Sequence, residues 1–203
     1  MDTPNCYFNG GRWGWINYND PSTSDITACK KYFTKIFQAI ANPAKGTYCN
    51  LFRLHLDPCW TNDNSVHYCE KTGDGEADIQ HFSKTRLRTF LRTLYWKIIQ
   101  KALKHGLYVV VRPPGVCPGD INVGGVYNNY LMDVWDIVTQ NDSILKYSGQ
   151  VSIELANEPI NLYDANGKSS ATAKHDFFQP IVDKMRQNGY TGVIWVPGTG
   201  YQS

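Results

Sequence analysis

The sequence predicts an α/β fold and, within that class, the first part of a (β/α)8 (TIM) barrel. Helical and strand-like segments alternate along the chain, and several strand-like segments are continuous apolar runs typical of parallel strands buried on both faces. Polar or aromatic residues follow where these runs end. We count about five strands and four helices in 203 residues, whereas a complete barrel takes about 250 residues. Residues 1–203 are therefore expected to form one architectural unit, the N-terminal portion of one barrel.

The first elements are expected before residue 60. An early strand is predicted somewhere between Cys6 and Trp15. The segment STSDITACKKYFTKIFQAIAN carries apolar residues at helical spacing, with Ser and Thr available as N-caps and Pro43 after its end. The segment CNLFRLHLDP alternates apolar and polar residues and ends at a proline, which predicts a strand.

A long loop, a helix and a strand are predicted next. The loop, about 59–82, is rich in Asn, Asp and Gly. The helix is expected from about Ser83 to His105, because apolar residues recur at helical spacing and Gly106 suits the position after a helix end. The β-branched run LYVVVRPPG then predicts a buried parallel strand.

Two further helix and strand pairs complete the predicted order. Helices are expected at about 126–140 and 174–188, the second ending before Gly189. Strands are expected in VSIEL and in GVIWVPGTG. Strands that alternate with helices in this way predict parallel βαβ units.

Composition excludes several classes of partner. The net charge is only +2, and the longest basic stretch, KTRLRTFLRTLYWK, has the pattern of a solvated helix face, so we predict no nucleic-acid partner. No run of about 18 apolar residues exists, so no membrane span is predicted. The six cysteines show no C-x-x-C spacing, which disfavours zinc, and no metal or cofactor is expected.

The cysteines favour a secreted, disulfide-bearing protein, with buried free thiols as the open alternative. Cys59, Cys69 and Cys117 fall in loops that share one face of a barrel, so a bridge from Cys117 to Cys69 or Cys59 is the predicted pairing. Spacing alone does not choose among the possible connectivities.

The predicted strand ends place polar residues on one face, because the loops after parallel strands converge there. Glu158 follows the apolar strand of VSIELANEP, where a carboxylate is either paired, solvated in a loop or chemically employed. No G-x-G-x-x-G loop opens a helix, which disfavours a nucleotide-binding doubly wound sheet. The other residues at these ends are His55, Asp57, Trp60, Arg112, Asn157 and Tyr201.

The motifs LFRLHLDPCW, ELANEP and VIWVPGTGY, in this order, resemble strands two, four and five of glycoside hydrolase family 5, the cellulase family. This resemblance implies a (β/α)8 barrel that hydrolyses β-1,4-linked glycans with net retention. It implies that Glu158 is the general acid/base, that Asn157 bonds the sugar 2-hydroxyl, and that Arg53 holds the nucleophile carboxylate.

The family nucleophile is a Glu after strand seven, which this chain does not supply. Glu154 lies four residues before Glu158, about 13 Å along a strand, whereas retention needs carboxyl groups about 5 to 5.5 Å apart. Asp57 precedes a proline and is expected to be a turn residue. Arg112, in VVVRPPGV, stands where the family often shows histidine, which leaves the preferred glycan open.

Loop aromatics are the predicted sugar platforms, because sugar rings present apolar C–H faces. Trp60 is the first choice, whereas Trp195, inside a strand, is expected in the core, and His55 is expected to line the site. The predicted substrate-binding residues are Trp60, His55, Trp13, Trp15, Arg112, Tyr163 and Tyr201.

The leading functional hypothesis is an endo-acting glycosidase for cellulose, mixed-linkage glucan or xyloglucan, located outside the cell. A mannanase or xylanase on the same scaffold is the nearest rival, and a carbohydrate-binding protein without catalysis is the rival from another class. The expected partners are the β-linked glycan and a missing C-terminal barrel half, supplied by a longer chain or a second chain.

Overall fold

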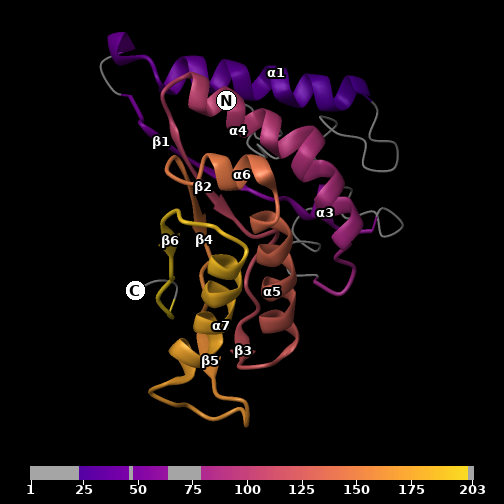
Figure 1. Ribbon diagram of the computed structural model, residues 1–203, viewed down its shortest axis with the longest axis vertical. Helices are drawn as coiled ribbons and strands as arrows, with labels where there is room; N and C mark the ends of the chain where they lie inside the picture. Colours follow the sequence, from indigo (N-terminus) through magenta and orange to yellow (C-terminus); the bar gives the residue numbers. More distant parts are fainter. Residues whose placement is uncertain (1–22, 46–47, 64–78, 201–203) are drawn as a thin grey trace.

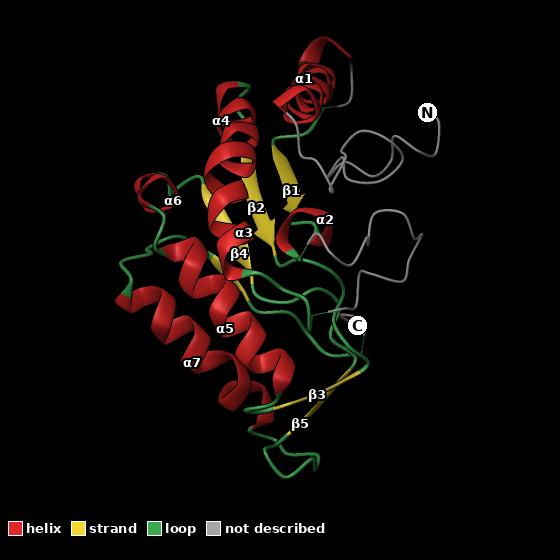
Figure 2. Ribbon diagram, turned by 90° about the vertical axis from the view of Figure 1, so that its right-hand side faces the viewer, coloured by secondary structure: helices red, strands yellow, loops and turns green. Residues whose placement is uncertain are grey.

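A computed structural model describes residues 23–45, 48–63 and 79–200, so the strand predicted between Cys6 and Trp15 lies outside the described residues. Two parallel sheets organise the described part (Figures 1 and 2). The predicted α/β class with a parallel sheet is confirmed. The main sheet has the order β1 (Leu51–His55), β2 (Tyr108–Arg112), β4 (Val151–Glu154), β6 (Ile194–Trp195), and the small sheet pairs β3 (Asp120–Asn122) with β5 (Asn161–Tyr163).

The helices connect these strands, and α4, α5 and α7 lie along one side of the main sheet (Figure 2). The predicted long helices are all present within a few residues of their expected bounds. The helices are α1 (Thr23–Ile40), η2 (Pro43–Lys45), α2 (Pro58–Thr61), α3 (Lys84–Phe90), the π-helical turn η5 (Leu91–Tyr95), α4 (Trp96–Lys104), α5 (Val126–Thr139), α6 (Asp142–Lys146) and α7 (Ala173–Gln187).

The two faces of the main sheet differ in character. Strand pairing sets Phe52 beside Val109, and Val109 beside Val151, on the face that packs against the helices. Alternation along each strand therefore turns the intervening residues to the other face, which lines the inside of a barrel. That inner face is mixed and partly open, with polar residues beside Leu51 (43% exposed) and Trp195 (51% exposed).

The helix predicted at 83–105 is present: α3, η5 and α4 join into one continuous helix over residues 84–104, which we call the rod and which contains one π turn. Ser83 caps it, because its hydroxyl accepts from the Arg86 amide at 3.3 Å. Between α3 and α4, η5 follows the wider i→i+5 pattern of a π turn. A π turn holds one residue more than an α-helical turn. The extra residue keeps the apolar stripe facing the core, where Leu91, Leu94 and Tyr95 are all buried.

The predicted disulfide of Cys117 is wrong. Cys117 carries a free thiol buried near Tyr127, Cys29 is free and buried on α1, and Cys49 is free and exposed. Burial raises the pKa of both the Cys29 and the Cys117 thiol to about 12. The open alternative of buried free thiols therefore holds for these two positions.

This difference in burial predicts selective alkylation. Because the thiolate is the reactive species, iodoacetamide at pH 8 should modify Cys49 in the folded protein and leave Cys29 and Cys117 unmodified. Cys29 and Cys117 should both react after denaturation. Peptide mass spectrometry of native and denatured samples measures this, with Cys49→Ser as the control, and rapid labelling of native Cys117 would contradict it.

Candidate active site

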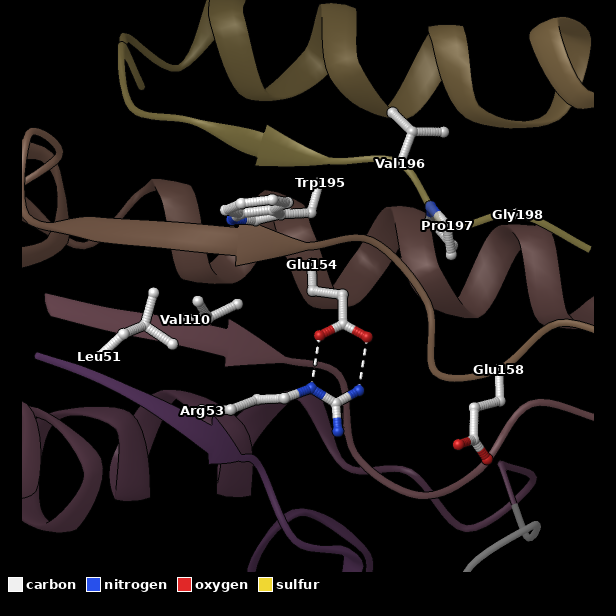
Figure 3. A pocket seen from close by; sticks show the side chains of 9 residues that line it. All are labelled: Leu51, Arg53, Val110, Glu154, Glu158, Trp195, Val196, Pro197 and Gly198. Carbon is white, nitrogen blue, oxygen red and sulfur yellow. Dashed lines mark hydrogen bonds and ion pairs between the residues drawn. The ribbon is translucent and has the colours of Figure 1, made fainter. Parts of the chain in front are cut away.

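One pocket lies on the inner face of the main sheet, toward the carboxyl ends of its strands (Figure 3). Its volume is about 430 Å³. Charged groups from β1, β4 and the loop after β4 meet the indole of β6 there. The lining residues are Leu51, Arg53, Val110, Glu154, Glu158, Trp195, Val196, Pro197 and Gly198.

Arg53 and Glu154 form an ion pair across the intervening strand β2 (Figure 3). The Arg53 Nε donates to Glu154 Oε2 at 2.6 Å, and its Nη2 donates to Oε1, so the pairing is two-pronged. These hydrogen bonds raise the pKa of Arg53 further above its usual value. Glu154, which the sequence suggested only as an unsuitable nucleophile, is therefore the carboxylate that Arg53 holds in this chain.

The same guanidinium orients Asn157. Its Nη2 donates to Asn157 Oδ1 at 2.9 Å, which fixes the amide so that its NH2 group remains the donor. The Asn157 side chain is only 5% exposed, and its backbone oxygen accepts from the Cys117 amide at 3.3 Å. Arg53 therefore contacts both Glu154 and Asn157 in the structure.

Glu158 lines this pocket in an unusual backbone conformation. Its φ is +51°, whereas the other described residues with positive φ are all glycines. The left-handed region costs a residue with a Cβ roughly 1 to 2 kcal/mol, and such conformations concentrate at functional sites. The Glu158 side chain is exposed and lines the pocket with Arg53 and Glu154.

The ion pair predicts a modest effect of Glu154→Gln. The variant keeps the volume but loses the charge and one acceptor, so Arg53 should hold Asn157 less firmly. Because the Arg53 side chain is 44% exposed, solvent screens the pair and the free energy of unfolding should fall by only about 1 kcal/mol. Chemical denaturation measures this loss. A matched Asp183→Asn variant, at an exposed position of α7, should change the free energy of unfolding by less than about 0.5 kcal/mol, and equal effects of the two variants would contradict the assigned role.

His55 and Arg112 support a loop and do not line the described pocket. His55 is 9% exposed; its Nε2 accepts from the Gly115 amide at 2.9 Å and its Nδ1 lies 4.0 Å from Asp57 Oδ2. Arg112 donates to the Gly115 oxygen at 3.1 Å. The two side chains, paired across β1 and β2, therefore brace the turn after β2, where Gly115 has φ +73°.

The aromatic predictions are corrected at two positions. Trp60, the first choice as a sugar platform, is fully buried in α2, with its ring centroid 4.5 Å from that of Phe90. Trp195, expected in the core, is 51% exposed, lines the pocket and donates from Nε1 to Ser152 Oγ at 3.0 Å. The pairing of Glu154 with Trp195 explains this, because partners in register share a face.

The remaining predicted platforms are not at the pocket. Tyr163 is half-buried in β5, where it pairs with Asn122 of β3 in the small sheet. Trp13, Trp15 and Tyr201 lie outside the described residues. Within the described part of the chain, no group of three or more His, Cys, Asp or Glu side chains could hold a metal ion, and no helix is both long and apolar enough to cross a membrane.

Comparisons with known proteins identify where this fold occurs. No protein-family model and no curated protein matches the sequence. Among solved structures, a glycoside hydrolase has a TM-score of 0.53 and 16% identity over 83% of this chain and 47% of its own. XacCel5A has a TM-score of 0.52 and 17% identity over 84% of this chain and 45% of its own. A hyperthermophilic endo-β-1,4-glucanase in complex with substrate has a TM-score of 0.48 and 14% identity over 85% of this chain and 44% of its own.

The chain has the fold of part of a (β/α)8 barrel. It shares this fold with glycoside hydrolases of known structure at low sequence identity. It spans less than half the length of the solved structures that it matches. Active sites of such barrels lie at the carboxyl ends of the strands. The pocket around Arg53, Glu154 and Glu158 lies at that end of the sheet.

Proposed function

We propose that the protein is a retaining, endo-acting glycoside hydrolase for β-1,4-glucan. The observation that carries the proposal is the pocket that Arg53 and Glu158 line together, with Asn157 hydrogen-bonded to Arg53 beside it, at the strand ends of a barrel fold shared with glycoside hydrolases. Retaining hydrolysis uses two carboxyl groups, one as acid/base and one as nucleophile. Glu158 is the acid/base in this proposal.

The reaction is a double displacement. Glu158 donates its proton to the glycosidic oxygen as the bond from that oxygen to the anomeric carbon breaks, while a second carboxylate supplies the electron pair that forms the glycosyl-enzyme bond. The ionised Glu158 then takes a proton from water, which displaces the enzyme carboxylate and releases the sugar. The exposed position of Glu158 in the pocket suits both proton transfers.

The neighbours of Glu158 suit substrate positioning. The amide NH2 of Asn157, oriented by Arg53, can donate to a sugar hydroxyl. The exposed Trp195 indole offers a flat apolar surface for a sugar ring. Arg53 also retains a donor, since its Nη1 bonds none of the described residues. That nitrogen is where a nucleophile carboxylate from the remainder of a longer protein would bind.

An assay of the full-length protein on a panel of soluble β-glycans tests this proposal. Carboxymethyl cellulose, mixed-linkage glucan and xyloglucan should be cut internally, and the first product seen by NMR should have the β configuration. Faster cleavage of mannan or xylan would show that the protein is a mannanase or a xylanase instead. Binding of glucan without turnover would replace the proposal with a non-catalytic carbohydrate-binding protein.

A further inference from the structure

Half of the cationic side chains gather on two adjacent helices. Ten of the 20 Lys and Arg residues lie on α1 or on the α3–α4 rod. The sequence holds no Asp or Glu between Asp78 and Asp120. The rod lies beside α1 (Figure 1), and the two are in contact through α4. The small net charge of +2 therefore hides a strong asymmetry.

The cations of the rod form one row, which we call the basic row: Lys84, Arg88, Arg92, Lys97, Lys101 and Lys104, all exposed. Spacing of four residues keeps Lys84, Arg88 and Arg92 on one side. The π turn then matters, because a five-residue step from Arg92 to Lys97 keeps the same side where helical geometry is i→i+5. The row is about 30 Å long at 1.5 Å per residue.

Few carboxylates neutralise this row. Among the described residues, Lys84 pairs with Asp133 of α5 at 2.7 Å, and none of the other five cations has a carboxylate partner. Asp136, which also belongs to α5, is bonded to Lys184 at 3.3 Å and to Asn188 at 2.9 Å. On the adjacent α1, Lys31 and Lys35 are also exposed and without such a partner in the described part of the chain.

A groove interrupts the row at its two arginines. It has a volume of about 290 Å³ and lies between the rod and the α5–α6 corner. Its walls combine Arg88 and Arg92 with the hydroxyl of Thr89 and the amides of Gln140 and Asn141. The Asn141 oxygen already caps α6 through the Ser143 and Ile144 amides, so its NH2 group is the end available to a ligand. Paired guanidinium groups beside neutral donors suit a carboxylate on a hydroxyl-rich molecule.

We propose that the basic row and its groove bind a carboxylated polysaccharide, one built from uronic acid residues. The polymer would run along the rod, with one uronate between Arg88 and Arg92 and neighbouring sugar hydroxyls on Thr85, Thr89 and Thr93. The surface lies on the helix side of the sheet, whereas the active-site pocket opens on its other face. This site is therefore separate from the proposed catalytic one.

Two other polyanions fit the rod less well. Single-stranded nucleic acid is held largely by stacking on aromatic side chains, yet Phe90, Tyr95 and Trp96 of the rod are all buried. A membrane surface needs an exposed apolar helix face, and the apolar stripe of the rod packs in the core. Hydroxyls and amides between the cations instead match a sugar polymer.

Binding to polygalacturonic acid, with its fully methyl-esterified form as the uncharged control, tests the proposal. The folded protein should bind polygalacturonate at least about tenfold more tightly than the ester, and more weakly as salt rises, since exposed charges are screened over about 10 Å at 0.1 M salt. Isothermal titration calorimetry and affinity electrophoresis measure both. Equal binding of the ester would overturn the proposal.

Variants locate the site. Arg88→Gln with Arg92→Gln should weaken polygalacturonate binding about tenfold, the loss expected from about 1.4 kcal/mol, without changing thermal unfolding because both side chains are exposed. Lys168→Gln with Lys174→Gln, which removes the same charge from an exposed segment elsewhere, should leave binding within about twofold. Equal loss in both pairs would contradict the proposal.

Two further measurements distinguish the basic row from the catalytic pocket and from a nucleic-acid surface. Glu158→Gln should leave polygalacturonate binding unchanged whether or not the protein hydrolyses glucan, so failure of one proposal is distinguishable from failure of the other. A single-stranded DNA oligomer should bind more weakly than polygalacturonate at the same salt, because the aromatic side chains of the rod are buried. Tighter binding of the DNA would replace the polysaccharide with a nucleic acid as the partner.

Discussion

Glu158→Gln should lower hydrolysis of β-glucan by about two to four orders of magnitude, the usual contribution of a general acid/base. Glutamine preserves the shape and the pocket contacts of the side chain but holds no transferable proton. Glucan affinity should therefore stay within about twofold, because the loss falls on the transition state alone. Initial rates of the full-length protein and calorimetric titration of the glucan measure the two quantities.

The backbone at Glu158 provides a matched control. At φ +51° a glycine is the least strained residue, so the Glu158→Gly variant should fold at least as stably as the native chain. It should nevertheless lose hydrolytic activity, because it has no carboxyl group. Inactivity then reports lost chemistry and not lost structure. Aryl glucosides with good leaving groups need less protonation and should lose less in their first step. Turnover of natural glucan that survives either substitution would disprove the role of Glu158.

The long elements could be predicted because hydrophobic periodicity fixes them locally. LYVVVR and VSIEL are too apolar for surface positions, and the helices at 84–104 and 126–139 carry complete stripes. The short elements could not: α2, α6, β3 and β5 are three to five residues long, too short to show a hydrophobic period, and β3 and β5 form by pairing with each other across distant parts of the sequence. The π turn at Leu91–Tyr95 likewise depends on how the rod packs against the core, which the local sequence does not show.

The site was predictable where a motif names adjacent residues and unpredictable where it depends on register. Asn157 and Glu158 follow one strand, so the sequence places them together. The partnership of Arg53 with Glu154 crosses β2, and only the pairing of β1 with β2 and of β2 with β4 reveals it. A clue existed, because Glu154 is a carboxylate inside an apolar strand, and such a group needs a partner.

The sequence also failed to predict which of Trp60 and Trp195 is buried, and the exchange of their expected roles gives the last prediction. Trp60→Ala should lower the free energy of unfolding by about 3 to 5 kcal/mol, the cost of truncating a fully buried large aromatic residue. Trp60→Phe should recover most of that stability, because a smaller ring can still pack on Phe90. Neither should alter glucan affinity when compared at a temperature where the variant is folded.

Trp195→Ala should behave in the opposite way. About half of this side chain is already in water, at 51% exposure, so the free energy of unfolding should fall by only about 1 kcal/mol. Losing the indole that lines the pocket should weaken glucan binding about three- to tenfold, since stacked aromatic contacts contribute about 0.5 to 1.5 kcal/mol. Trp195→Phe keeps a flat surface without the Nε1 donor to Ser152 and should restore much of the affinity. Thermal denaturation and glucan titration of all four variants measure the contrast, and a Trp195→Ala protein that binds glucan normally would return Trp195 to a structural role.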